Sequence, residues 1–207
     1  VRTYTKKGPG KASLFQPASI LDVVVYHNDL KNLQRLRDYK WGYLYRHVFS
    51  DVRKNTVALF MVELLQKTIR QPEPNDDLYS FIEDALMHLD TAGEVVTGNF
   101  PLFFSLHLAS FFGFQIRDNF SASRNILDLL NGSFVDHIPD HPHFIDGELS
   151  ETASHLLKIL HPHELENIRL TQKTKGLLLE AVLAFYSLQI PEFGTMRTIP
   201  VLREILS

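Results

Sequence analysis

Basic and aromatic side chains gather in the first quarter of the sequence. Residues 1–54 contain eleven lysines and arginines against four aspartates and no glutamate, whereas the rest of the chain contains ten basic and twenty acidic residues. Ammonium and guanidinium groups neutralise phosphates, and aromatic rings stack on unpaired bases. The first quarter is therefore where we expect a polyanion to bind. The candidate stacking rings, some of which must belong to the core, are Tyr4, Phe15, Tyr26, Tyr39, Trp41, Tyr43 and Tyr45.

Histidine supplies a second candidate chemistry. The triplet His-Pro-His occurs at positions 141–143 and again at 161–163, and Asp136, His137 and Asp140 precede the first copy. Four imidazoles can hold a zinc ion when the fold brings them together. Two histidines flanking a proline are not a usual helical ligand pair, however, so we expect surface histidines and no metal or other cofactor. An enzyme would need a bound metal or convergent acid groups around His141 and His161.

No motif for nucleotide hydrolysis or nucleophilic catalysis is complete. The stretch GPGKAS at residues 8–13 is similar to a phosphate-binding loop, but that loop requires G-x-x-x-x-G-K-[ST]. Thr5 occupies the position of its first glycine and Ala12 the position of its hydroxyl residue. The motifs G-x-S-x-G and H-E-x-x-H are absent. We therefore predict a basic loop without regular structure here, and a binding protein that is not an enzyme.

Composition limits the class further. The apolar fraction of 44% is enough for a core, and the lack of cysteine excludes disulfides and thiolate-bound metal. No apolar run reaches the roughly 18–20 residues that span a bilayer, and no leader peptide is visible. We therefore predict a cytoplasmic protein without membrane association. The chain opens on Val1 in place of methionine, so we expect it to be trimmed at its start.

Residues 1–49 have the pattern of strands. Residues 20–26 are rich in β-branched side chains and predict one strand, and residues 33–39 predict a second after a turn. In a regular second strand, Leu33, Arg35, Arg37 and Tyr39 share one face. Residues 1–7 alternate as well and predict a third strand. Three strands are few for a closed sheet, so we expect the β part to be incomplete.

From residue 50 onward, apolar residues recur at helical spacing, which predicts an α+β fold with a mostly helical domain over residues 50–207. We expect helices over residues 51–70, 76–89, 99–112 and 150–160, one or two between 164 and 190, and a short one over 200–206. Residues 125–134 predict either a short helix or a hairpin at Asn131–Gly132. The apolar stretch 100–114 is predicted to form the core and to line a peptide pocket in part. The caps and breaks expected are Ser50, Asn75, Gly93, Gly98, Asn99, Pro101 and Ser150.

Four stretches resemble the bacterial RecO family of recombination mediators. LFQPASILDVVVYHNDLKNLQRLRDY (residues 14–39) is similar to the end of the family's N-terminal OB-fold, and DVRKNTVALFMVELLQKTIR (51–70) to the first helix of its helical domain. FPLFFSLHLASFFGF (100–114) resembles the apolar helix before the family's zinc-site region. FYSLQIPEFGTMRTIPVLREIL (185–206) resembles its C-terminal end. The resemblance covers the whole chain.

The resemblance implies that residues 1–49 are part of an OB-fold, a small Greek-key barrel that binds single strands. The family has more strand sequence before the point that matches Val1, so we expect upstream strands to be missing. Many members carry a four-cysteine zinc site in the stretch that matches residues 118–143. This chain has no cysteine there, and His137, Asp140, His141 and His143 fall in the same interval, where we expect a metal-free loop.

The resemblance also implies a function and partners. A protein of this kind binds single- and double-stranded DNA, anneals complementary strands and engages the acidic C-terminal tail of the single-strand-binding protein. With RecR it helps to load RecA onto DNA coated with that protein, at the bacterial nucleoid. We expect the tail pocket in the helical domain, with apolar walls and a cation, but the sequence assigns no residues to it.

Charge and resemblance together select the residues expected to contact DNA. Each cation of the first quarter can neutralise one phosphate and release a counterion. The alternative is a helical protein-interaction scaffold whose basic head binds an acidic protein partner and not DNA. The expected contacts are Arg2, Lys6, Lys7, Lys11, Arg35, Arg37, Lys40, Arg46, Arg53 and Lys54.

Overall fold

The computed structural model describes residues 12–31, 33–70 and 73–206. It confirms an α+β protein with two small sheets, one of order β1-β2 and one of order β4-β3-β5. The expected strand over residues 1–7 lies outside the described residues. The elements are η1 (Ala12–Phe15), β1 (Leu21–Tyr26), β2 (Arg35–Trp41), α1 (Val52–Thr68), α2 (Asp76–Thr91), α3 (Glu94–Leu108), η2 (Ala109–Phe112), β3 (Ile126–Asp128), β4 (Ser133–Val135), β5 (Phe144–Ile145), α4 (Gly147–Leu157), η3 (Pro162–Asn167), α5 (Gln172–Gln189) and α6 (Thr198–Ile205).

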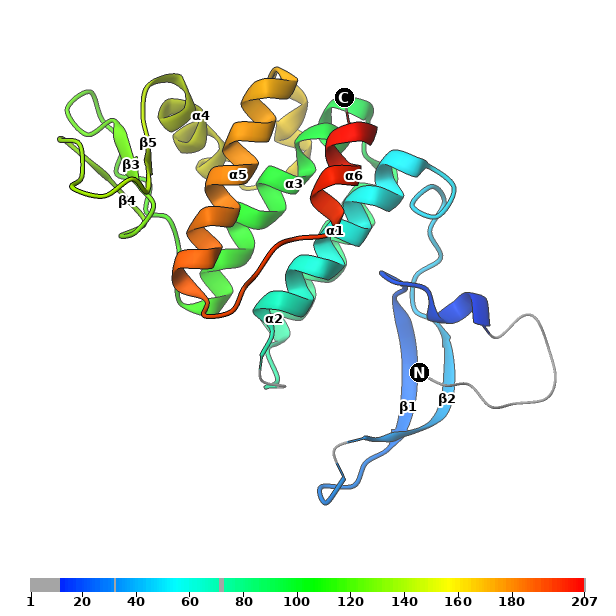
Figure 1. Ribbon diagram of the computed structural model, residues 1–207. Helices are drawn as coiled ribbons and strands as arrows, with labels where there is room; N and C mark the ends of the chain where they lie inside the picture. The colour runs from blue at the N-terminus through cyan, green and yellow to red at the C-terminus, as the bar shows by residue number, and fades with distance from the viewer. Residues whose placement is uncertain (1–11, 32, 71–72, 207) are drawn as a thin grey trace.

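The antiparallel β1–β2 hairpin projects from the helical body, and the β3–β4–β5 sheet lies at the other end of that body (Figure 1). Three successive valines, at positions 23–25, and Tyr26 on β1 are between 42 and 57% exposed, so both faces of the hairpin are open along this part of β1. Two strands cannot close a barrel. The described residues therefore contain no closed barrel, and the expected OB-fold is not confirmed.

The register of the hairpin corrects one expectation. Tyr26 pairs with Arg35 and Val23 pairs with Tyr39, with a register shift between Val24 and Val25. Positions 23 and 26 point to opposite faces of β1 because side chains alternate along a strand. Their partners do the same, so Arg35 and Tyr39 do not share a face as regular alternation had predicted. A β-bulge of this kind is invisible to a pattern of period two.

Helix α3 forms the centre of the helical body, with α1 and α5 beside it (Figure 1). Phe100, Leu102, Phe103 and Phe104 are at most 3% exposed, which confirms the predicted core. The segment Glu94–Phe112 is long and apolar enough to cross a membrane by length and composition alone, contrary to our expectation. Two thirds of it is buried inside the protein, however, as in a core helix of a globular fold.

Two helix starts differ from the predicted ones. Helix α1 is capped by Asp51, whose carboxylate accepts the backbone N–H groups of Arg53 and Lys54, and not by Ser50. Helix α4 begins after Asp146, four residues before the expected cap at Ser150. An aspartate and a serine are both good caps, so the local pattern alone could not choose between them.

Helix α3 also starts earlier than predicted, and the break expected at Gly98 does not occur. The helix begins after Gly93 and continues through Gly98 and Pro101. Asn99 is no cap, because its buried side-chain amide donates to the carbonyl oxygens of Leu165 and Ile168. Burial against η3 outweighs the local preference of glycine and proline to end a helix.

Other predictions are confirmed. Asn75 caps α2 through a hydrogen bond from the N–H of Leu78. Of the two alternatives for residues 125–134, the hairpin is correct: β3 and β4 pair around Gly132, which has a φ of +61°. The carboxylate of Asp128 fastens this turn by accepting the N–H groups of Leu130 and Asn131.

Candidate nucleic-acid interface

Arg35, Arg37 and Tyr26 lie together on one face of the hairpin. Arg35 is the cross-strand partner of Tyr26, and the guanidinium of Arg37 lies 5.9 Å from the centre of the Tyr26 ring. Such a cation–π contact holds the charge over the ring without neutralising it. Within the described residues, Arg35 has no hydrogen-bond or ion-pair partner through its side chain. This face therefore offers two available positive charges beside an exposed ring.

The other expected contacts are placed differently. Lys40 forms an ion pair of 3.4 Å with Asp22 on β1, and both side chains are largely exposed, so a phosphate can compete for the lysine. Arg46 is exposed in the segment that follows β2. Arg53 is exposed on α1 and pairs with Glu94. Arg2, Lys6, Lys7 and Lys11 lie outside the described residues.

Lys54 does not lie with the other cations. Its side chain is buried, at 7% exposure, and its ammonium donates to the backbone carbonyl of Asp90 at 2.7 Å. The ammonium is therefore occupied by a contact within the protein, and we leave Lys54 out of the interface.

The candidate rings separate into an exposed and a packed group. Tyr26 is 57% exposed, whereas Tyr45 is buried and donates its hydroxyl to the carbonyl of Ala18 at 2.7 Å. Trp41 and Tyr45 both contact Phe49 at the base of the hairpin, so these rings build the junction with the helical body. Tyr4 lies outside the described residues. Among the described rings of the first quarter, Tyr26 is the one best placed to stack on a base.

Asp90, at the end of α2, fixes the segment between the hairpin and α1. Its fully buried carboxylate accepts backbone N–H groups from Arg46, His47 and Val48 at 2.7 to 3.1 Å. Burial alone would raise the pKa of Asp90, but these three hydrogen bonds outweigh it and hold the pKa below its usual range. The carboxylate therefore anchors the base of the hairpin as an anion.

A second feature lies in the helical body, where an apolar groove of about 400 Å³ runs between α3, α5 and α6. The ammonium of Lys175 borders it at Gly98, where an added Cβ would lie 2.8 Å from Nζ. Burial lowers the pKa of Lys175, and its ammonium has no hydrogen-bond or ion-pair partner within the described residues. The sequence pattern could not reveal this groove because its walls come from segments far apart in the chain. The apolar residues that line it are Pro101, Leu102, Leu177, Leu179, Leu202 and Leu206.

Helix α6, one wall of this groove, is held by a carboxylate from α1. Glu63 accepts the backbone N–H groups of Arg197 and Thr198 and the hydroxyl of Thr198 at 2.6 to 2.8 Å. Burial would raise the pKa of Glu63, but these hydrogen bonds lower it overall. The groove therefore depends on a cap that lies outside it.

The histidines form pairs and not a cluster. The rings of His141 and His143 are 6.0 Å apart, and those of His161 and His163 are 5.6 Å apart. His141 lies 3.4 Å from the carboxylate of Asp128. Within the described residues, no three histidine, aspartate or glutamate side chains lie close enough to share a metal ion.

One side-chain constellation has residue types that occur in hydrolases. The hydroxyl of Ser154 donates to the carboxylate of Asp118 at 2.7 Å and accepts from the ammonium of Lys158 at 3.1 Å. Ser154 is fully buried, however, and no substrate can reach it in this structure. The three side chains fasten α4 to the segment before β3.

These features define an α+β protein in which a hairpin with exposed cations is joined to an acidic helical body. The model of the family described as "Recombination protein O C terminal" matches residues 49–197. The chain is 25% identical to the DNA repair protein RecO of Phocaeicola vulgatus over 98% of this chain and 83% of that protein. It is 28% identical to the DNA repair protein RecO of Christiangramia forsetii, over 97% and 82% of the two chains. No solved structure matches this chain.

The chain therefore belongs to the RecO family, as its sequence had indicated. Membership gives it a role in DNA repair and recombination and makes it a DNA-binding protein.

Proposed function

We propose that this chain is a recombination mediator, a binding protein and not an enzyme. It binds single- and double-stranded DNA through the hairpin, anneals complementary strands, and engages the C-terminal tail of the single-strand-binding protein. With RecR it helps to load RecA onto DNA that the single-strand-binding protein covers. Residues 1–49 act as the DNA-binding part, of OB-fold type, and residues 50–207 as the helical part. We place it in the bacterial cytoplasm at the nucleoid.

The single observation that supports the DNA site best is the exposed face of Tyr26, Arg35 and Arg37. Among the described residues no acidic side chain forms an ion pair with its two guanidinium groups, and its ring is open to solvent. Backbone phosphates bind such cations without regard to sequence. The acidic excess of residues 55–207 repels a polyanion and favours its approach along the hairpin.

The groove between α3, α5 and α6 is the best candidate for the tail. An acidic peptide that ends in an aromatic residue needs apolar walls for its ring and a cation for its carboxylates. The groove has both, since leucines line it and Lys175 borders it. Lys173 adds positive charge at the same place, whereas Arg203 is paired with Glu180, which also lines the groove.

Charge reversal tests the DNA site. The affinity for a labelled single strand is measured by fluorescence anisotropy at low salt for the wild type, for Arg35→Glu with Arg37→Glu, and for the control Arg124→Glu. Arg124 is an exposed cation just before β3 in the chain, and β3 lies at the other end of the helical body from the hairpin (Figure 1). We expect the double variant to bind at least tenfold more weakly and the control to bind like the wild type. An unchanged affinity of the double variant would remove this face from the DNA site.

The scaffold alternative is tested in the same titration. An acidic polypeptide such as polyglutamate is added to the preformed DNA complex at equal charge. The mediator proposal expects the oligonucleotide to stay bound. Complete displacement at equal charge would favour a head that recognises acidic proteins.

A further inference from the structure

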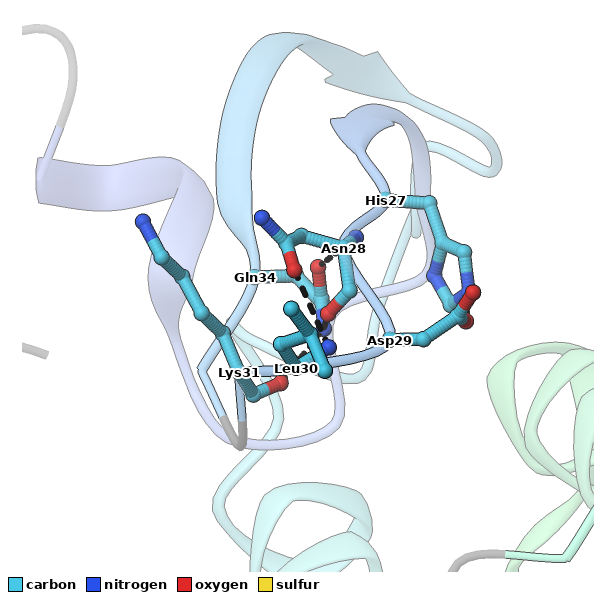
Figure 2. Close-up of polar contacts among 6 residues, drawn as sticks. All are labelled: His27, Asn28, Asp29, Leu30, Lys31 and Gln34. Carbon is cyan, nitrogen blue, oxygen red and sulfur yellow. Dashed lines mark hydrogen bonds and ion pairs between the residues drawn. The ribbon is translucent and has the colours of Figure 1, made fainter.

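The tip of the β1–β2 hairpin is fastened by its own polar side chains. Gln34 Nε2 donates to the carbonyl oxygens of Asn28 and Lys31 at 3.0 and 2.7 Å, and Gln34 Oε1 accepts the N–H of Asn28 at 2.8 Å (Figure 2). The N–H of Leu30 donates to Asn28 Oδ1 at 3.0 Å. These bonds replace apolar packing, so the conformation of the tip does not require its leucines to be buried.

A hollow of about 410 Å³ lies beside this fastened turn. Two of its lining residues are apolar or aromatic and exposed, with Leu33 at 88% and Tyr26 at 57% exposure. Two others, Lys31 and Arg35, carry positive charge and are exposed. The hollow is therefore large enough for one nucleotide and presents an aromatic ring beside two cations.

We propose that this hollow holds one unstacked nucleotide of a single DNA strand. The base lies against the Tyr26 ring and Leu33, and its phosphate is bound by Lys31 and Arg35. This inference rests on the proposed DNA-binding function and adds to it the place where the strand is gripped. Stacking on aromatic side chains supplies affinity without regard to sequence, since every base has a π-face.

The polar groups of the tip argue for a site that does not read the base. The side-chain oxygen and nitrogen of Gln34 are both used by the loop backbone, and Asn28 Oδ1 is used by Leu30. His27 is bonded to Asp29 at 2.6 Å. The Gln34 amide is therefore taken up by the loop backbone and is not available to read a base edge. We expect most of the affinity to come from stacking on Tyr26, which every base can make.

Charge argues for an anionic ligand over an apolar partner, and the exposed Tyr26 ring favours a nucleotide among anionic ligands. The acidic residue nearest to the tip, Asp29, is already paired with His27. Lys31 and Arg35 line the hollow together with Tyr26, and neither has an acidic partner among the described residues. A purely apolar partner would leave them unsatisfied.

The experiment uses a single strand that carries one 2-aminopurine, a base whose fluorescence changes with stacking. Anisotropy and 2-aminopurine emission are recorded together for the wild type, Tyr26→Ala, Tyr26→Phe and Leu30→Ala. We expect Tyr26→Ala to weaken binding by about tenfold, within the range seen for one base–aromatic stack, and to abolish the emission change. Tyr26→Phe keeps the ring and should retain both signals. Leu30→Ala is the matched control, because Leu30 is exposed at the same tip but does not line the hollow.

A second variant tests the hollow without the risk that the substitution disturbs the fold of the hairpin. Leu33 is almost fully exposed, so Leu33→Ala has no packing to lose and should weaken binding two- to fivefold. The inference is overturned, and the proposed function stands, if the wild type binds DNA and both Tyr26→Ala and Leu33→Ala give the same affinity and the same 2-aminopurine emission change as the wild type. If the wild type fails to bind single strands at low salt, both fall together. Loss of the emission change on adding polyglutamate at equal charge would assign the hollow to an acidic peptide and also overturn the inference.

Discussion

Replacing Asp90 by asparagine should loosen the junction between the hairpin and the helical body. Asparagine fills the same space and keeps one acceptor oxygen, but it has no charge and directs an amide toward backbone N–H groups. A hydrogen bond to a charged acceptor contributes roughly 1.5–3 kcal/mol and a neutral one roughly 0.5–1.5. Three donors at 2.7 to 2.9 Å lose that charge assistance. We therefore expect the free energy of unfolding to fall by about 3 kcal/mol, or by about 8 °C in Tm for a chain of this length.

The pH dependence distinguishes this mechanism from a simple packing defect. Hydrogen bonds lower the pKa of Asp90 in the folded state, despite its burial. A group with a lowered folded pKa contributes stability above its unfolded pKa, about 3.9 for aspartate, and loses that contribution as pH falls through the folded pKa. The difference in unfolding free energy between wild type and variant should therefore be largest near pH 7 and shrink below about pH 4.

The assay is urea unfolding of the wild type, Asp90→Asn and Asp84→Asn, from pH 7 down to pH 3. Asp84 is the matched control, since it is an exposed aspartate on the same helix. Its replacement should change the free energy of unfolding by less than about 0.5 kcal/mol. Equal midpoints for wild type and Asp90→Asn at pH 7, or a difference that stays constant to pH 3, would refute the reasoning.

Three further predictions concern the groove and its supports. Gly98→Ala should keep or raise the unfolding midpoint, because alanine favours a helix. It should weaken the binding of an acidic peptide with an aromatic end, because its Cβ displaces the Lys175 ammonium. Unchanged binding of this peptide in an anisotropy titration would contradict this role of Lys175. Lys175→Glu should lower the affinity for the same peptide more than tenfold and leave the affinity for DNA unchanged. A parallel loss of both affinities would argue against separate sites. Glu63→Gln should lower the free energy of unfolding by about 1–2 kcal/mol and speed amide hydrogen exchange in α6; exchange equal to that of the wild type would show that α6 does not depend on this cap.

Local sequence pattern was sufficient for much of the helical body. The core face of the segment 100–114 and the Asn75 cap follow from short-range rules of periodicity and capping. For residues 125–134 the same rules left a short helix and a hairpin open, and the structure has the hairpin. The start of α3 could not be predicted in this way, because burial of Asn99 against η3 carries the helix through Gly98 and Pro101. A sequence window of about eighteen residues holds no information on contacts between residues almost seventy positions apart.

The candidate sites show the same division. Charge counting located the cations of the hairpin, but it could not separate exposed Arg35 from Lys54, whose ammonium is used by Asp90. The alternation of residues 33–39 predicted a shared face for Arg35 and Tyr39, but the register shift places their side chains on opposite faces. The groove beside Lys175 had no sequence signal, since Gly98 leaves space for a lysine that lies seventy-seven positions further on.

The central claim is that this chain grips single-stranded DNA through cations on its hairpin, and the salt dependence of binding tests it most directly. The association constant of the wild type for a single-stranded oligonucleotide is measured by anisotropy between low and physiological salt. Each neutralised phosphate contributes about −0.7 to the slope of log K against log salt. Lys31, Arg35 and Arg37 together should therefore give a slope of about −2 or steeper. Absence of binding at low salt, or an affinity that does not change with salt, would contradict the account.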